Sequence, residues 1–103
     1  MHIARALAHQ SQFLDAIAQV ELPPQVVSVT LNLGTDWAGE AAVFFQVILA
    51  DNSVPRDQLL ALTKQIKWTI VRQIRPLQEW DVLPYFDFLT ESEQSNMKEP
   101  AWA

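Results

Sequence analysis

The architecture follows from two apolar stretches near the middle of the chain, VVSVTLNL at residues 26–33 and AAVFFQVILA at residues 41–50. Apolar and polar residues alternate in the first stretch, which predicts a β-strand with one buried face and one face in water. The second stretch also alternates, but Phe44 and Ile48 make its second face apolar as well. This two-sided apolar character favours a central position in a sheet, or a cover over the outer face.

Two amphipathic helices are predicted, one on each side of this strand pair. The first covers residues 3–21 and ends before two consecutive prolines, because proline does not continue a helix. The second runs from about residue 53 to Arg75 and ends at Pro76. The apolar stripes expected to face the core are Ile3, Leu7, Phe13, Leu14, Ile17 and Val20 in the first helix, and Leu59, Leu62, Ile66, Ile70 and Ile74 in the second.

The last third of the chain contains one more predicted strand. Residues 77–82 are expected to form a loop and residues 83–89 a strand, in which Pro84 favours an edge position. The pattern leaves open whether this strand lies beside the first or the second strand. Together the elements predict an α+β two-layer sandwich in the order helix–strand–strand–helix–strand, with both helices on one face of a three-stranded sheet. The domain is expected to span residues 1–90, followed by an acidic, flexible tail at residues 91–103.

Composition excludes several classes of function. The chain has 103 residues, enough for one domain with a single core. Twelve acidic residues against seven basic ones give a net charge of −5, which argues against binding to nucleic acid. The absence of cysteine excludes disulfides, thiolate metal sites and cysteine nucleophiles. No stretch approaches the roughly 20 apolar residues that cross a bilayer, so we expect a cytoplasmic protein outside the membrane.

No group of residues carries the signature of an enzyme or of a metal centre. His2 and His9 could share a helix face, but no third ligand follows at short spacing. Asp51 and Asp57 flank a predicted turn and helix start, where carboxylates commonly cap helices. Neither histidine has a nucleophile and an orienting acid nearby in the sequence. We therefore predict a protein that is not an enzyme and that uses no metal or cofactor.

The connection GTDWAGE at residues 34–40 is predicted to be a turn and not a phosphate-binding loop. It joins two strands instead of a strand and a helix, and it carries Asp36 and Glu40 where an anion would lie. Its tryptophan, Trp37, has two interpretations. It closes the end of the core, or it faces a partner together with Asp36.

A basic stripe is predicted on the second helix, where four of the seven basic residues lie between positions 64 and 75. Lys64, Trp68, Arg72 and Arg75 share one helix face, with Lys67 close by. This face could grip an acidic partner or stack a nucleic-acid base on the tryptophan. The alternative is an ordinary solvated face, with cations near the helix C-terminus where the helix dipole favours them.

An apolar surplus on the sheet gives the sharpest functional inference. Helices on one side leave the other sheet face to water, and there the second strand presents Phe44 and Ile48. Such a patch is typical of an oligomer or partner interface, unless the tail with Trp102 folds back over it. The third strand adds one of two pairs to this face, Phe86 and Phe88 or Tyr85 and Leu89.

The order of the elements resembles two known domains. One is ribosome-binding factor A, a KH-like domain, and the other is the cytoplasmic dimerisation domain of cation diffusion facilitators. This chain departs from the first in being acidic, and from the second in lacking matching histidine and acidic metal ligands. Residues 26–93 also look like a set of short uncharacterised bacterial proteins, a resemblance that brings no activity. Its motifs here are Asp36–Trp37, Val43–Phe44–Phe45, Asp51–Asn52, and Tyr85 to Phe88 followed by Glu91–Ser92–Glu93.

The sequence therefore favours a non-enzymatic protein-interaction module that acts as a homo-oligomer or as the small subunit of a partner. The alternative is an RNA- or ribosome-associated KH-like domain that uses the basic stripe, although no Gly-x-x-Gly clamp is present. A small ligand-binding or catalytic domain is the third hypothesis. The candidate partner-binding residues are Trp37, Phe44, Ile48, Lys64, Trp68, Arg72 and Arg75.

Overall fold

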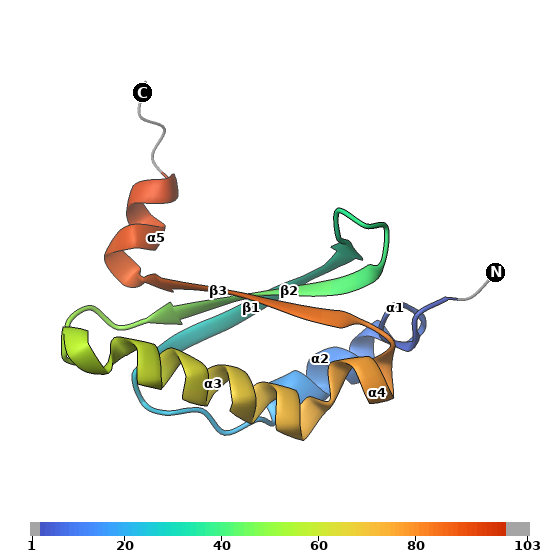
Figure 1. Ribbon diagram of the computed structural model, residues 1–103, viewed down its shortest axis with the longest axis horizontal. Helices are drawn as coiled ribbons and strands as arrows, with labels where there is room; N and C mark the ends of the chain where they lie inside the picture. The colour runs from blue at the N-terminus through green and yellow to red at the C-terminus, as the bar shows by residue number, and fades with distance from the viewer. Residues whose placement is uncertain (1–2, 99–103) are drawn as a thin grey trace.

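The computed structural model describes residues 3–98, with the side chains of residues 3–96. It confirms the α+β fold: a three-stranded sheet carries helices packed against one face, and a further helix rises from the other face (Figure 1). The elements are α1 (Arg5–Ala8), α2 (Gln10–Ala18), β1 (Val26–Thr35), β2 (Ala41–Leu49), the 3-10 turn η1 (Arg56–Gln58), α3 (Leu59–Ile74), α4 (Pro76–Trp80), β3 (Leu83–Thr90) and α5 (Glu91–Lys98).

The sheet has the order β1-β2-β3, so the predicted central position of β2 is confirmed. β1 runs antiparallel to β2, and β3 runs parallel to it. The position of the third strand, which the sequence left open, is therefore beside the second. Pro84 lies on the edge strand β3, as expected of a residue that cannot donate a backbone hydrogen bond.

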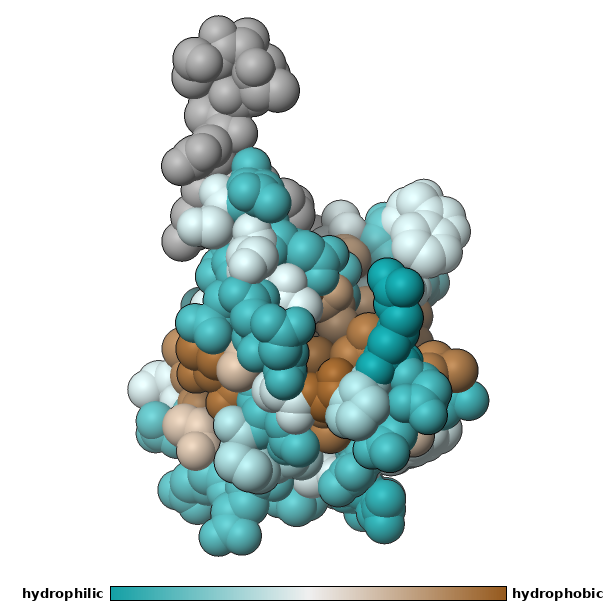
Figure 2. Space-filling view, turned by 90° about the vertical axis from the view of Figure 1, so that its left-hand side faces the viewer, coloured by the Kyte–Doolittle hydropathy of each residue, from teal (hydrophilic) through white to brown (hydrophobic). Residues whose placement is uncertain are grey.

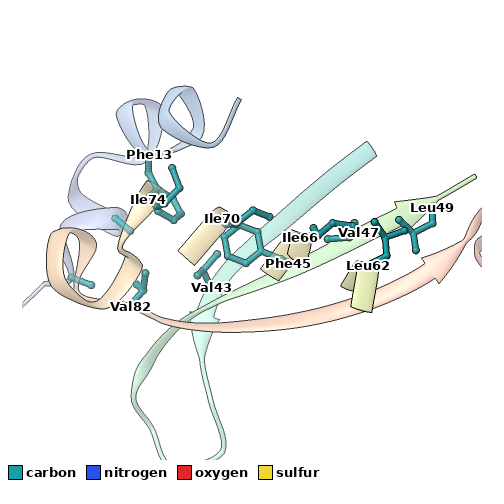
Figure 3. Close-up of a cluster of buried hydrophobic side chains, with 12 residues drawn as sticks. Phe13, Val43, Phe45, Val47, Leu49, Leu62, Ile66, Ile70, Ile74 and Val82 are labelled. Atoms are coloured by element: carbon teal, nitrogen blue, oxygen red, sulfur yellow. The ribbon is translucent and has the colours of Figure 1, made fainter. Parts of the chain in front are cut away.

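The core lies between β2 and α3. Alternate residues of β2 point toward the helix, and Phe45 lies between Val43 and the α3 residues Ile66 and Ile70 (Figure 3). The ring of Phe86 on β3 stacks on Phe45 with 4.9 Å between the centroids. Four of the five residues in the stripe predicted for the second helix are buried, namely Leu62, Ile66, Ile70 and Ile74. The fifth, Leu59 at the start of α3, is 38% exposed.

The predicted first helix is two shorter helices. His9 has φ −131° and ψ 55°, which interrupts the helical backbone between α1 and α2. Because this break rotates the two segments relative to each other, a stripe drawn with one continuous helical period is only partly buried: Phe13 is in the core, and Ile17 and Val20 pack against it. The prediction that Ile3, Leu7 and Leu14 are core residues is wrong, since they are 62%, 38% and 49% exposed. The buried residues of this region are Phe13, Ala4 and Ala6.

The predicted loop at residues 77–82 contains the short helix α4. Pro76 begins the helix at a position whose backbone amide would have no partner within the helix, so the missing N–H of proline costs nothing there. Arg75 and Asp81 flank the helix in left-handed conformations, with φ of 52° and 60°. The helix places Trp80 against Phe13, with the ring centroids 5.0 Å apart. α4 therefore closes the core next to α2.

The predicted flexible tail is helical over its first eight residues, which form α5. Thr90 and Glu93 form a reciprocal capping box: the Thr90 amide donates to the Glu93 carboxylate at 3.2 Å, and the Glu93 amide donates to the Thr90 hydroxyl at 3.2 Å. The backbone amide of Ser92 donates to the Asp51 carboxylate at 3.1 Å, which ties α5 to the turn after β2. Trp102 lies outside the described residues.

Within residues 3–98, no helix has the length and apolar character that would let it span a bilayer.

Candidate functional site

The sheet face opposite α3 is called the open face. Residues in register on neighbouring strands point to the same side of a sheet, and the core side is identified by Phe45 and by Phe86 and Phe88 packed against it. The choice between the two residue pairs of β3 is therefore settled: Tyr85 and Leu89 point to the open face. The open face carries Ser28, Thr30 and Asn32 of β1, Phe44, Gln46 and Ile48 of β2, and Tyr85, Asp87 and Leu89 of β3.

Helix α5 divides the open face into a covered half and an exposed half. It contacts β2 and β3 and stands on the side opposite α3 (Figure 1). Ile48, in the half of β2 nearer α5, is 1% exposed. The sequence-based prediction that Ile48 binds a partner is therefore wrong, because its side chain is buried. Phe44, which lies on the same strand but farther from α5, is 36% exposed. Figure 2, in which the left-hand end of Figure 1 faces the viewer, shows apolar surface between hydrophilic side chains above and below.

Three rings on the exposed half form the aromatic cluster, defined as Trp37, Phe44 and Tyr85. Phe44 and Tyr85 stack nearly parallel, with centroids 5.4 Å apart and an interplanar angle of 18°. Trp37 also packs on Tyr85, with centroids 5.4 Å apart and an interplanar angle of 59°. Trp37 is 86% exposed, so the interpretation in which it closes the core is wrong. The cluster is a raised apolar surface built from the β1–β2 loop and from two strands.

Asp36 holds the loop that carries Trp37. Its Oδ1 accepts hydrogen bonds from the amides of Ala38 and Glu40, at 2.9 and 3.0 Å, and its Oδ2 accepts one from the Tyr85 hydroxyl at 2.8 Å. Gly39 completes the turn with φ +82°, a conformation that other residues rarely adopt. The Asp36 carboxylate therefore holds the loop in one conformation and also connects it to Tyr85 of the aromatic cluster.

The hydrogen bonds of Asp36 also shift two titrations. The amide of Glu40 and, second, the hydroxyl of Tyr85 lower the pKa of Asp36 below its ordinary value of 3.8. The same carboxylate raises the pKa of Tyr85 above 10.0, with partial burial as the second cause. The stabilisation linked to Asp36 is present above pH 3.8 and is lost as the pH falls through its lowered pKa. The contribution of Tyr85 is complete below pH 10.0 and is lost as the pH rises through its raised pKa.

Tyr85 is the single tyrosine of the chain, so its ionisation can be followed by ultraviolet absorbance without interference from another phenol. We expect a midpoint above pH 10.0, and a shift back toward 10.0 in Asp36→Asn, because the asparagine removes the negative charge while keeping an oxygen that can accept the amides. Asp87→Asn is the matched control, since Asp87 shares the open face but has no hydrogen bond to Tyr85 among those found in the described residues. An equal shift in both variants would show that the Asp36 contact does not cause the perturbation.

The exposed half of the open face carries acidic and neutral polar groups. Asp36 and Asp87 contribute carboxylates, and Thr30, Asn32 and Gln46 contribute neutral polar side chains. None of the open-face residues of the three strands is basic. A phosphate backbone would meet repulsion at this surface, whereas a cationic group would be attracted to it.

The basic stripe lies on the other side of the molecule. Lys64, Trp68 and Arg72 are exposed on α3, and Trp68 is 55% exposed. Arg75 ends the helix in a left-handed conformation and lies 3.6 Å from the Glu79 carboxylate, a partly exposed ion pair. The seven predicted partner-binding residues therefore do not form one site. Trp37 and Phe44 belong to the aromatic cluster, the α3 residues and Arg75 to a separate surface, and Ile48 to the covered region.

A groove of about 640 Å³ lies between α1, α4 and the β1–β2 loop. Its wall is mainly apolar, and Glu40 and Asp81 are the acidic residues that line it. Within residues 3–98, no cluster of histidine, cysteine and carboxylate residues could hold a metal ion. The groove is lined by Ile3, Ala4, Leu7, Thr35, Gly39, Glu40, Ala41, Leu77, Asp81 and Leu83.

Sequence reasoning missed the role of Tyr85, and it left the cover over Ile48 open as an alternative without predicting the helix that provides it. The role of Tyr85 as the centre of the cluster depends on strand register, which no local pattern reveals. The cover over Ile48 has a local signal, because Thr90-Glu-Ser-Glu93 matches the capping-box pattern that marks a helix start. A helix predicted there would have indicated that the outer face of β2 is partly covered.

The fold and the site define the chain as a small α+β domain whose sheet is covered by helices on one face and presents an exposed aromatic cluster on the other. Comparison with protein-family models, curated proteins and solved structures finds no match to this chain.

Proposed function

We propose that the chain is a non-enzymatic protein-interaction module that binds a partner protein through the aromatic cluster on its open face. The observation that carries this proposal is Trp37, which is 86% exposed and yet packs on Tyr85 and sits on a loop fixed by Asp36. A large ring in this position contributes nothing to the core of the described chain.

Exposed aromatic anchors are the residues that most often dominate binding energy in protein interfaces, tryptophan and tyrosine above all. The hydrogen bonds of Asp36 order the loop before a partner arrives, so less conformational entropy is lost on binding. The aromatic surface with polar Asn32 and Gln46 beside Phe44 also matches the usual plan of an apolar centre and a polar rim.

The charge of the open face specifies the kind of partner. The open-face residues of the three strands include one charged residue, Asp87, and Asp36 of the β1–β2 loop adds a second carboxylate. None of the open-face strand residues is basic, so neither carboxylate is balanced by a base from the strands. A segment that combines lysine or arginine with an apolar or aromatic side chain would complement both the carboxylates and the rings. We therefore infer that the partner presents a basic, partly apolar segment.

Selection from a library of random displayed peptides tests this function directly. Peptides retained by the chain are expected to be enriched in lysine or arginine next to apolar residues, and to lose binding to Trp37→Ala. Trp68→Ala is the matched control, because Trp68 is also an exposed tryptophan but lies on α3. Peptides that bind both variants equally, or acidic peptides that require Trp68, would contradict the proposal.

RNA binding through α3 is the second candidate function. Trp68 is 55% exposed and lies among Lys64, Lys67 and Arg72, an arrangement that could stack a base between phosphate contacts. Titration of the chain with single-stranded RNA at several salt concentrations separates the two functions. Submicromolar affinity that falls steeply with salt and is lost in Trp68→Ala would favour RNA, because each phosphate contact releases counterions.

A further inference from the structure

We propose that the chain forms a two-fold symmetric homodimer in which the free edge of β1 pairs antiparallel with β1 of a second copy. The dimer would join two three-stranded sheets into one continuous sheet of six strands. This inference uses residues outside the aromatic cluster and does not depend on the proposed function.

The two edges of the sheet differ in their protection. β3 carries Pro84 and Asp87, and proline and charge are devices that keep an edge strand from pairing with another chain. β1 (Val26–Thr35) spans ten residues and contains neither a proline nor a charged residue. Within the described residues, β2 is the strand that pairs with it, and its other edge faces no strand. A long, neutral, unprotected edge is the feature that most strongly indicates strand pairing between chains.

The side chains of β1 are also incompletely covered. Val29, Leu31 and Leu33 point to the helix side and are half-buried, whereas their neighbours in register on β2 are fully buried. A groove of about 260 Å³ runs beside Leu31 and Leu33, between β1 and the first two helices. Leu7 and Leu14, which were wrongly predicted as core residues, form its helical wall and are exposed. The edge therefore presents both free backbone groups and a strip of uncovered apolar side chains.

The pattern of β1 is complementary to itself, which selects a second copy as the occupant. Antiparallel pairing centred on Leu31 places Leu31 opposite Leu31 of the second copy, and Val29 opposite Leu33 of the second copy. Thr30 then faces Asn32 of the second copy. Apolar residues meet apolar residues on the helix side, and polar residues meet polar residues on the open face. A shift that sets a helix-side residue opposite an open-face residue would place polar residues against apolar ones, so the pairing is limited to registers centred on a single residue, and we propose the one centred on Leu31.

Charge supports the same choice. Each copy has a net charge of −5, so two copies repel unless they meet at a neutral surface. A symmetric contact through the open face would bring the carboxylates of Asp36 and Asp87 of the two copies together. A symmetric contact through α3 would bring together Lys64 and Arg72 of the two copies. β1 carries no charged residue, so its pairing places no like charges directly across a two-fold axis.

The oligomeric state, measured by sedimentation velocity over a range of concentrations, tests the proposal. The unmodified chain is expected to dimerise reversibly. Thr30→Lys combined with Asn32→Lys is expected to weaken the dimer by roughly 100-fold, because the introduced lysines face each other across the axis. Both positions are exposed, so the monomer should still fold, which circular dichroism can verify. Gln73→Lys combined with Gln78→Lys adds the same charge at exposed positions of α3 and α4 and should leave the dimer intact.

A cysteine cross-link tests the register independently, because the natural chain has no cysteine. Leu31→Cys should form an intermolecular disulfide on mild oxidation, since residues opposite each other in antiparallel strands have Cα atoms about 4.5–5.5 Å apart, within the range that a disulfide spans. Gln73→Cys on α3 should remain largely unlinked. A chain that is monomeric at every concentration would overturn the proposal. So would a dimer that survives the two lysines on β1, or one that Leu31→Cys does not cross-link.

Discussion

Phe45→Ala is expected to lower the free energy of unfolding by about 3–5 kcal/mol, because it removes a ring from the centre of the core and leaves a cavity there. Phe45 is 1% exposed, lies against α3 and stacks on Phe86. A loss of this size is a large fraction of the stability of a domain of this length. Urea denaturation followed by circular dichroism measures it, as a lower midpoint with an unchanged slope.

Phe44→Ala is the matched control, since the same substitution at the adjacent residue changes the other face of β2. Phe44 is 36% exposed and stacks on Tyr85, so its loss should cost about 1 kcal/mol. The variant should keep the fold and lose affinity for the partner, whereas Phe45→Ala should lose stability first. Equal losses of stability in the two variants would contradict the assignment of Phe44 to the open face.

Trp37→Ala is expected to weaken binding of a basic peptide selected by the open face at least about 30-fold, the effect typical of a hot-spot tryptophan. Its stability should change by no more than about 0.5 kcal/mol, because the ring is 86% exposed and packs on one neighbour. Isothermal titration of the peptide against both proteins measures the change in affinity.

Two further variants define the origin of this effect. Trp68→Ala should bind the peptide as the unmodified chain does, since Trp68 lies on α3, away from the open face. Asp36→Asn should weaken binding less than Trp37→Ala, because it removes a charge while leaving a group that can accept hydrogen bonds from Ala38 and Glu40. If Trp37→Ala binds normally, the aromatic cluster is not the binding surface.

The outcome at the two helical regions shows why some predictions held and others did not. In α3 the helical spacing continues without interruption, so the stripe Leu62, Ile66, Ile70 is buried as predicted. In the N-terminal region His9 leaves the helical conformation, and the stripe predicted across it is only partly confirmed: Phe13 is buried, and Ile17 and Val20 pack against the core, but Ile3, Leu7 and Leu14 are exposed. The exposed Leu7 and Leu14 that result are the residues that line the groove beside β1.

The chain by itself determined the α+β class, the central place of β2 and the buried stripe of α3, because these depend on periodicity and on proline, which are local properties. The tertiary structure determined which residues form the candidate site. Strand register brings Tyr85 against Phe44, the Trp37 ring packs on Tyr85 as well, and a hydrogen bond across 49 residues joins Tyr85 to Asp36. Contacts between residues so distant in sequence depend on how the elements pack, and this information is absent from any single stretch of the sequence.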